Sequence, residues 1–225
     1  MHDKQPTAAH PNPKDRNRSI IWARFAADST EWVIIAARAT ESSSDAGPQK
    51  LVSISLLGPG GKVLMETLIK TNEFGAREAI EGHGIDYSVL MQARTYKDAI
   101  AEIKQHIERK QVLCWDTVEI RQILSQVAAA NKEDAFSLPL ISVGEEYGRF
   151  HGTLKPGTSS YELPELKREK SALDEARNVL FAIMEMAGSS QYMDSASASP
   201  MGWTGEFYRP KASPAEKIKG FLGIE

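Results

Sequence analysis

The order of the apolar segments between residues 32 and 187 constrains the fold of this chain more than any other feature. Three runs of strand length come first, "WVIIAA", "LVSISLL" and "KVLMETLI", and the "GPGGK" stretch between the last two is typical of a turn. Strands that follow each other through such a short turn pair antiparallel. The sequence therefore predicts an antiparallel meander with strands at residues 32–37, 51–57 and 63–69.

Helical spacing replaces strand spacing after this meander. In "TYKDAIAEIKQHIERK" the residues Ala99, Ile100, Ile103 and Ile107 share one helical face, and the apolar "QVLCW" run that follows has the length of a buried strand. A strand that is apolar on both faces and follows a helix indicates an α/β layer. The remaining pattern predicts helices at residues 95–110, 118–131 and 172–187 and strands at 112–115 and 138–142.

The segments outside this central region have a different composition. Residues 1–18 are rich in proline and polar side chains, so we expect a disordered N-terminal tail there. Residues 19–188 are predicted to form one domain, because 225 residues suffice for one ordinary core. The small-residue stretch at 189–202 is predicted to be a linker, and residues 203–225 a C-terminal appendage.

The appendage ends in "SPAEKIKGFLGIE", which begins with a capping box formed by Ser213 and Glu216. Ile218, Phe221 and Leu222 make a narrow apolar stripe on a helix that is too short to be stable alone in water. We therefore expect this helix to pack on its own domain or on a neighbouring subunit of a homo-oligomer.

The charge and the cysteine content narrow the function classes. With 27 basic against 30 acidic residues the net charge is -3, so nucleic-acid binding would require a local patch. Cys114 is the single cysteine, which excludes an internal disulfide. The sequence shows neither a signal-peptide pattern nor an apolar run that spans a bilayer. We expect a cytoplasmic protein without membrane association.

Several motifs together point to one known family. The segments "GKVLMETLIKTN" and "GHGIDYSVLMQARTYKDAIAEI" resemble the third strand, and the segment after it, of the DEDDh-type 3′–5′ exonucleases, a ribonuclease H-like family. "RKQVLCWDTVEIRQIL" and "KSALDEARNVL" stand where the family has its middle and its last acidic helices. The resemblance runs from about residue 32 to residue 187. It implies an α/β ribonuclease H-like exonuclease fold, with a mixed five-stranded sheet and helices on both faces.

The resemblance also assigns the family's catalytic positions to residues of this chain. Such enzymes hydrolyse phosphodiesters with two divalent metal ions, which are held by four carboxylates, and with a histidine as general base. The two acids of the first strand correspond to Ala36 and Arg38, the acid that opens the middle helix to Glu119, the base to Lys170 and the last acid to Glu175. Two of the four carboxylates remain, so no metal site is predicted.

The resemblance puts two basic residues, Arg38 and Lys170, near the two remaining acids. We expect Arg38 and Lys170 to act as counter-charges for Glu119 and Glu175, because the planar guanidinium group pairs well with carboxylates. In the simpler alternative, the two basic side chains point into solvent and the two acids are ordinary helix-surface residues.

The resemblance implies an exonuclease-fold protein that is catalytically impaired, has no cofactor, and binds single-stranded nucleic-acid 3′ ends or a protein partner. Thr40 and Trp115 correspond to positions at the nucleic-acid end of the family's cleft, and Trp115 either stacks on a base or fills the core. The alternative is an active 3′–5′ exonuclease with an atypical Mg or Mn site. Glu41 or Asp45 would then supply carboxylates, although Arg38 would repel a cation there.

Overall fold

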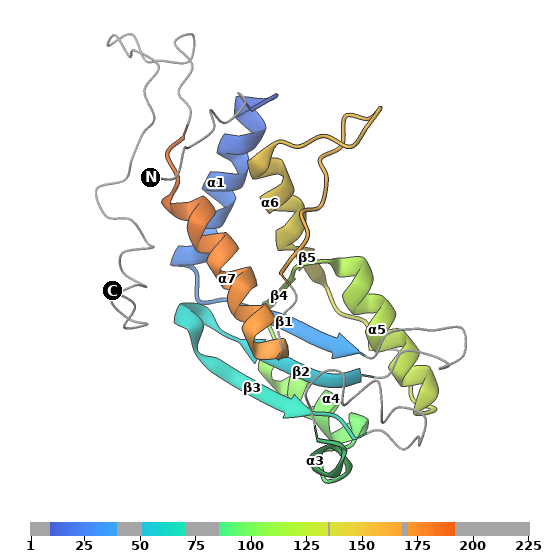
Figure 1. The fold of residues 1–225 in the computed structure, drawn as a ribbon. Helices are drawn as coiled ribbons and strands as arrows, with labels where there is room; N and C mark the ends of the chain where they lie inside the picture. Colours follow the sequence, from blue (N-terminus) through green and yellow to red (C-terminus); the bar gives the residue numbers. More distant parts are fainter. Residues whose placement is uncertain (1–9, 40–50, 71–85, 135, 168–170, 192–225) are drawn as a thin grey trace, which may run out of the picture. The chain divides into compact units, whose positions relative to one another are not determined.

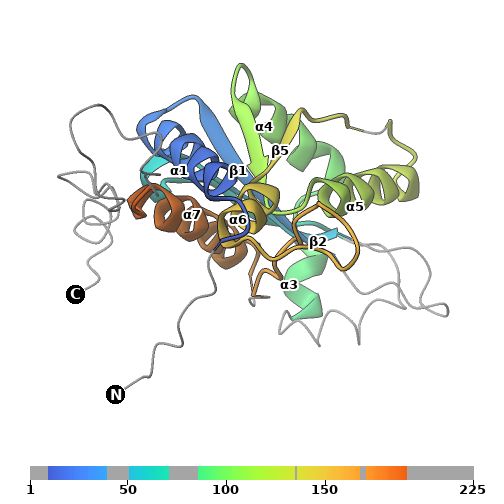
Figure 2. The same cartoon turned by 90° about the horizontal axis from the view of Figure 1, so that it is seen from above.

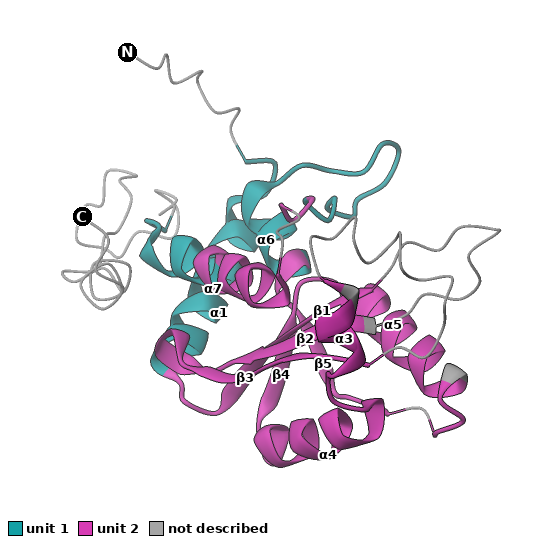
Figure 3. Ribbon diagram, turned by 60° about the horizontal axis from the view of Figure 1, so that its bottom comes forward, with its two compact units in different colours: residues 1–28, 145–164, 183–225 teal, residues 29–144, 165–182 magenta. Residues whose placement is uncertain are grey.

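The computed structural model describes residues 10–39, 51–70, 86–134, 136–167 and 171–191. Two compact units make up the chain (Figure 3). The sheet unit consists of residues 29–144 and 165–182, and the helical unit of residues 1–28, 145–164 and 183–225. Each unit is described by itself, and the single domain expected at residues 19–188 stays a prediction.

The sheet unit contains a mixed five-stranded sheet with the order β3-β2-β1-β4-β5 (Figure 1). β2 pairs antiparallel with β1 and with β3, whereas β4 pairs parallel with β1 and with β5. The predicted meander and the predicted mixed sheet are confirmed. The strands are β1 (Trp32–Ala39), β2 (Leu51–Leu57), β3 (Val63–Leu68), β4 (Gln111–Cys114) and β5 (Leu140–Ser142).

The three helices predicted between residues 95 and 187 are present, with ends within a few residues of the predicted ones. Three further helices, α1, α3 and α6, were not predicted from the sequence. None of the described helices is long and apolar enough to cross a membrane. The helices are α1 (Pro13–Asp28), α3 (Tyr87–Met91), α4 (Tyr96–Ile107), α5 (Thr117–Ala130), α6 (Val143–His151) and α7 (Ala172–Gly188).

Both faces of β1 are buried. Val33, Ile35 and Ala37 belong to the core that α4 and α5 form on one face of the sheet. Side chains alternate between the two faces of a strand, so Ile34 and Ala36 point to the other face. The first turns of α7 lie over that second face, opposite α4 (Figure 3). The sheet therefore has helices on both faces, as predicted.

The N-terminal tail predicted for residues 1–18 is wrong from residue 13 onwards, because α1 begins there. Asn12 caps this helix: its side-chain oxygen accepts a hydrogen bond from the Lys14 amide at 3.1 Å, and its carbonyl oxygen accepts one from the Asp15 amide. Pro13 at the first helical position favours the same start. Residues 192–202 of the predicted linker and the whole appendage lie outside the described residues.

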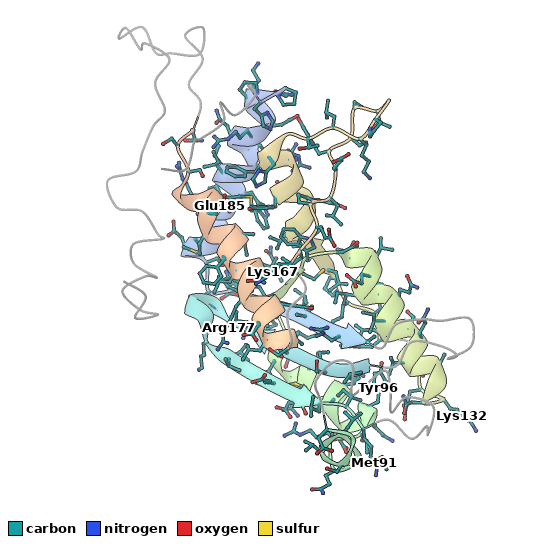
Figure 4. The ribbon with its side chains drawn as sticks, viewed as in Figure 1. Met91, Tyr96, Lys132, Lys167, Arg177 and Glu185 are labelled. Carbon is teal, nitrogen blue, oxygen red and sulfur yellow. The ribbon has the colours of Figure 1, made fainter. Side chains whose placement is uncertain are left out.

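In the helical unit, α1 lies beside α6 and the end of α7 (Figure 2). The Ser19 hydroxyl donates to the Glu146 carboxylate at 3.0 Å, and the Arg24 guanidinium donates to the Ala187 carbonyl oxygen at 3.1 Å. Tyr147 of α6 donates to the carboxylate of Glu185, which Figure 4 labels on α7, at 2.6 Å. Burial and then this hydrogen bond raise the pKa of Tyr147.

Gly148 of α6 is a position where any side chain would clash. A Cβ atom there would lie 2.2 Å from the carbonyl oxygen of Glu162. In Gly148→Ala the backbone must shift, and this cost exceeds the gain in helix propensity. We expect the free energy of unfolding to fall by about 1–2 kcal/mol. Urea denaturation measures the change.

Glu145→Ala is the matched control for this prediction, because Glu145 is an exposed residue of the same helix. Its effect should stay within about 0.5 kcal/mol. If the Gly148→Ala protein proved as stable as the wild type, α6 would not pack against Glu162 as closely as the structure places it.

Candidate functional site

The candidate site lies in the sheet unit, at the C-terminal ends of β1 and β4. These strands are parallel neighbours, with Ile34 opposite Leu113. β1 is also the strand at which the sheet changes from antiparallel to parallel pairing. In α/β sheets, ligand sites form outside the C-terminal strand ends, where the strand order reverses. The topology therefore favours this edge as a binding site.

Ala36 and Arg38 occupy the face of β1 that points away from the core of α4 and α5. Ala36 is 6% exposed and offers no polar atom in its side chain. Across the antiparallel pair, Ala36 lies opposite Ser55 of β2, and Arg38 lies opposite Ser53. This face thus carries one cationic and two hydroxyl side chains.

Ser53 and Ser55 are buried residues that were not predicted to belong to the site. They are 7% and 1% exposed, and neither hydroxyl has a hydrogen-bond partner among the described residues. Buried hydroxyl groups usually have a hydrogen-bond partner, so Ser53 and Ser55 can bind a water molecule or a ligand group at this face. The signal in the sequence is the alternation "VSISL", which places both serines on one face of a strand in the middle of the sheet.

Arg38 contacts Glu175. The guanidinium Nη1 atom lies 3.6 Å from Oε1 of the Glu175 carboxylate, and the two side chains are 13% and 9% exposed. Both residues make further interactions. The structure thus brings together two of the residues that the sequence places in a charge cluster. A side chain of this burial does not fit the alternative in which Arg38 points into solvent.

The N-terminus of α7 places Glu175 at this face. The Ser171 hydroxyl accepts a hydrogen bond from the Asp174 amide at 3.1 Å, and the Ser171 carbonyl oxygen accepts one from the Glu175 amide at 3.2 Å. The hydroxyl also donates to the Asp174 carboxylate, and this bond, followed by that of Arg177, lowers the pKa of Asp174. Figure 4 labels Arg177 on this helix. Both acids lie where the helix dipole favours negative charge.

Glu119 lies in the first turn of α5, the helix that follows β4. Asp116 is the N-cap of this helix, and its carboxylate accepts hydrogen bonds from the amides of Val118 and Glu119 at 2.7 and 3.3 Å. Because β4 and β1 run parallel, the start of α5 lies at the same edge of the sheet as Arg38. Glu119 is half-buried there.

Of the remaining predicted site residues, the structure describes Trp115 alone. Trp115 is only 9% exposed, which leaves little of its ring for stacking on a base and fits the predicted alternative of a core residue. Its carbonyl oxygen accepts a hydrogen bond from the Ser142 hydroxyl at 2.8 Å. Lys170 and Thr40 lie outside the described residues, as do Glu41 and Asp45. Their predicted roles stay predictions.

The described side chains of this site include hydrogen-bond donors as well as carboxylates. Mg²⁺ and Mn²⁺ require several oxygen ligands. Within the described part of the chain, no group of three or more Asp, Glu, His or Cys side chains comes together as metal ligands do. Guanidinium and hydroxyl groups are instead hydrogen-bond donors that can bind a phosphate or a carboxylate.

The fold that surrounds this site is that of the DEDDh-type 3′-exonuclease domains. The nuclease domain of 3'hExo, a DEDDh family member solved with bound rAMP, is similar with a TM-score of 0.55 and 13% identity, over 71% of this chain and 92% of that domain. The structure of a full-length 3'-exonuclease is similar with a TM-score of 0.51 and 13% identity, over 81% of this chain and 98% of the other.

At such low identity the likeness defines the fold, which is the α/β ribonuclease H-like architecture that the sequence predicted. No protein-family model matches the chain, and no curated protein matches it either. The activity of this chain must therefore be argued from its own residues.

Proposed function

We propose that this chain is a catalytically impaired exonuclease-fold protein, which binds the 3′ end of single-stranded nucleic acid at the C-terminal ends of β1 and β4. The contact between Arg38 and Glu175 carries the proposal. In this contact a cationic side chain lies beside Glu175, one of the two acids that the sequence resemblance assigns to the family's metal ligands.

The donor set does not fit two metal ions. Ala36 has no ligand atom, and Arg38 adds a positive charge where the family has a carboxylate. A divalent ion about 4 Å from a guanidinium would be repelled by roughly 8 kcal/mol at an effective dielectric constant of 20. Hydrolysis by this family depends on such ions, so we expect little or no cleavage.

Binding of a nucleic-acid end is supported by different observations. One similar nuclease domain was solved with bound rAMP, so its fold accommodates a nucleotide. In this chain, Arg38 offers the donor geometry that recognises a phosphate group. Because the net charge of the chain is -3, affinity must come from such local donors rather than from an overall field.

The test measures binding and cleavage separately. A single-stranded oligonucleotide with a fluorescent label at its 5′ end reports binding by anisotropy in EDTA, and nucleotide release in Mg²⁺ or Mn²⁺ is followed on a gel. The wild type should bind without releasing nucleotides, and Arg38→Met should bind about tenfold more weakly, as expected for the loss of one charged contact. An oligonucleotide closed into a circle should bind poorly.

Arg177→Met is the matched control for Arg38→Met, because Arg177 is a half-exposed arginine of α7 that pairs with Asp174. Its affinity should equal that of the wild type. Release of nucleotides by the wild-type protein would favour the alternative of an active exonuclease with an atypical metal site. Equal affinity of the Arg38→Met variant and the wild type would overturn the assignment of the binding site.

A further inference from the structure

Helix α1 carries an apolar patch on its exposed side. Ile21 is 43% exposed and Phe25 is 74% exposed, which makes Phe25 the most exposed large hydrophobic side chain of the described residues. The two residues are four positions apart and therefore adjacent on one side of the helix. Arg18 and Asp28, both exposed, extend this row by three positions at either end. We call these four residues the α1 patch.

The described chain ends next to this helix. The Arg16 guanidinium donates to the Ser190 carbonyl oxygen at 2.8 Å, and the Arg24 guanidinium donates to the Gln191 side-chain oxygen at 3.1 Å. Arg16 and Arg24 both belong to α1, so the residues after Gln191 begin beside the helix that bears the patch.

The length of chain after Gln191 lets the C-terminal segment 213–225 reach any part of the α1 patch. Residues 192–212 span about 70 Å when fully extended. As a flexible linker they would have a root-mean-square end-to-end distance of about 25 Å. Helix α1, with 16 residues, is about 24 Å long. The root-mean-square end-to-end distance of the linker is thus similar to the length of α1.

The side-chain pattern of segment 213–225 complements the α1 patch. Ile218, Leu222 and Glu225 are spaced by four and then three positions. Read in the opposite direction along α1, Phe25, Ile21 and Arg18 have the same spacing. An antiparallel arrangement therefore places apolar side chains on apolar side chains, and Glu225 next to Arg18. The parallel arrangement would instead bring Glu225 next to Asp28, which has the same charge.

We propose that residues 213–225 form an amphipathic helix that docks antiparallel on the α1 patch of its own chain. The segment covers Ile21 and Phe25 with Leu222 and Ile218, and Glu225 pairs with Arg18. A flexible tether of this length gives an effective concentration in the millimolar range. Docking therefore needs only a weak intrinsic affinity, which suits a segment with a narrow apolar stripe.

Hydrogen exchange of the full-length chain tests the docking. Amides of residues 216–224 should exchange about tenfold more slowly than in a synthetic peptide of residues 213–225, as expected when the intrinsic dissociation constant is about a tenth of the effective concentration. Phe25→Asp should return these amides to the exchange rate of the peptide. Phe181→Asp is the matched control, since Phe181 is a 47% exposed phenylalanine on α7, and should leave the protection intact.

Charge reversal tests the direction of the helix. Arg18→Glu and Glu225→Arg should each reduce the protection of residues 216–224, and the double variant should recover it. Wild-type protection no greater than that of the peptide would overturn the proposal, and so would protection that Phe25→Asp leaves unchanged. Protection that rises with protein concentration, together with a dimer mass in light scattering, would also overturn it, because the occupant would then be a second copy of the chain.

Discussion

The triple variant Ala36→Asp, Arg38→Glu and Lys170→His should be less stable than the wild type in EDTA, and Mn²⁺ should restore its stability. At a hundredfold excess of Mn²⁺ over its dissociation constant, the free energy of unfolding should rise by about 2.7 kcal/mol. Urea denaturation in EDTA and in Mn²⁺ measures both effects. The wild type should give the same curve in both solutions.

The physical reason lies in the balance of charge at the ends of β1 and β4. The variant adds two carboxylates to Glu119 and Glu175, which the same fold already holds in the first turns of α5 and α7. It also removes the guanidinium that contacts Glu175. Four acids then gather without a counter-ion, so the folded state repels itself until a divalent cation binds.

Cleavage by the triple variant should return only in part. Glu119 and Glu175 are one methylene longer than the aspartates with which the sequence resemblance aligns them. A displacement of about 1 Å at reacting groups can cost on the order of a hundredfold in rate. A control with Arg177→Glu in place of Arg38→Glu keeps the same net charge and should respond weakly to Mn²⁺. The hypothesis fails if the wild type binds Mn²⁺ and digests single strands as well as the triple variant does.

Breaking the contact between Arg38 and Glu175 should destabilise the protein more than any exposed ion pair. In Glu175→Leu the guanidinium stays largely buried without this carboxylate, and the expected loss is about 3 kcal/mol. Arg38→Met should cause a similar loss. The double variant should recover part of it, because two apolar side chains of similar size fill the same space. Urea denaturation of the four proteins gives the coupling energy.

Arg177 and Asp174 provide the comparison for this cycle. They form an ion pair at 2.9 Å on the surface of the same helix, with side chains 50% and 46% exposed. Solvent screens this pair, so its coupling energy should not exceed about 0.5 kcal/mol. Equal coupling energies for the two pairs would mean that burial does not strengthen the contact between Arg38 and Glu175.

The parts of the fold with strong local periodicity could be predicted from the sequence. The strand at 51–57 matches β2 residue for residue, because an apolar run between two polar stretches has clear ends. Helix α6 was missed since Gly144 and Gly148 lower its helix propensity, although Gly148 is needed for close packing on Glu162. Helix α1 was missed because Pro13 and the polar residues of its first turns resemble those of a disordered tail.

The candidate site, like the fold, could be predicted from the sequence only in part. A resemblance in sequence was enough to place Arg38 opposite Glu175, because both positions belong to recognisable segments. Ser53 and Ser55 were not found, since no residue type in their strand suggests chemistry. Their place depends on the register between β2 and β1, which brings Ser53 opposite Arg38. Such a relation arises from tertiary pairing and is not visible in either segment alone.

Arg38 is a cation that the chain carries as part of its own covalent structure. A bound metal ion exchanges with the medium, competes with other metals and is removed by chelators, whereas a side chain does none of these. The positive charge beside Glu175 is therefore present as soon as the polypeptide folds. Starvation for one metal or excess of another, which would silence or poison a two-metal enzyme, leaves this charge in place.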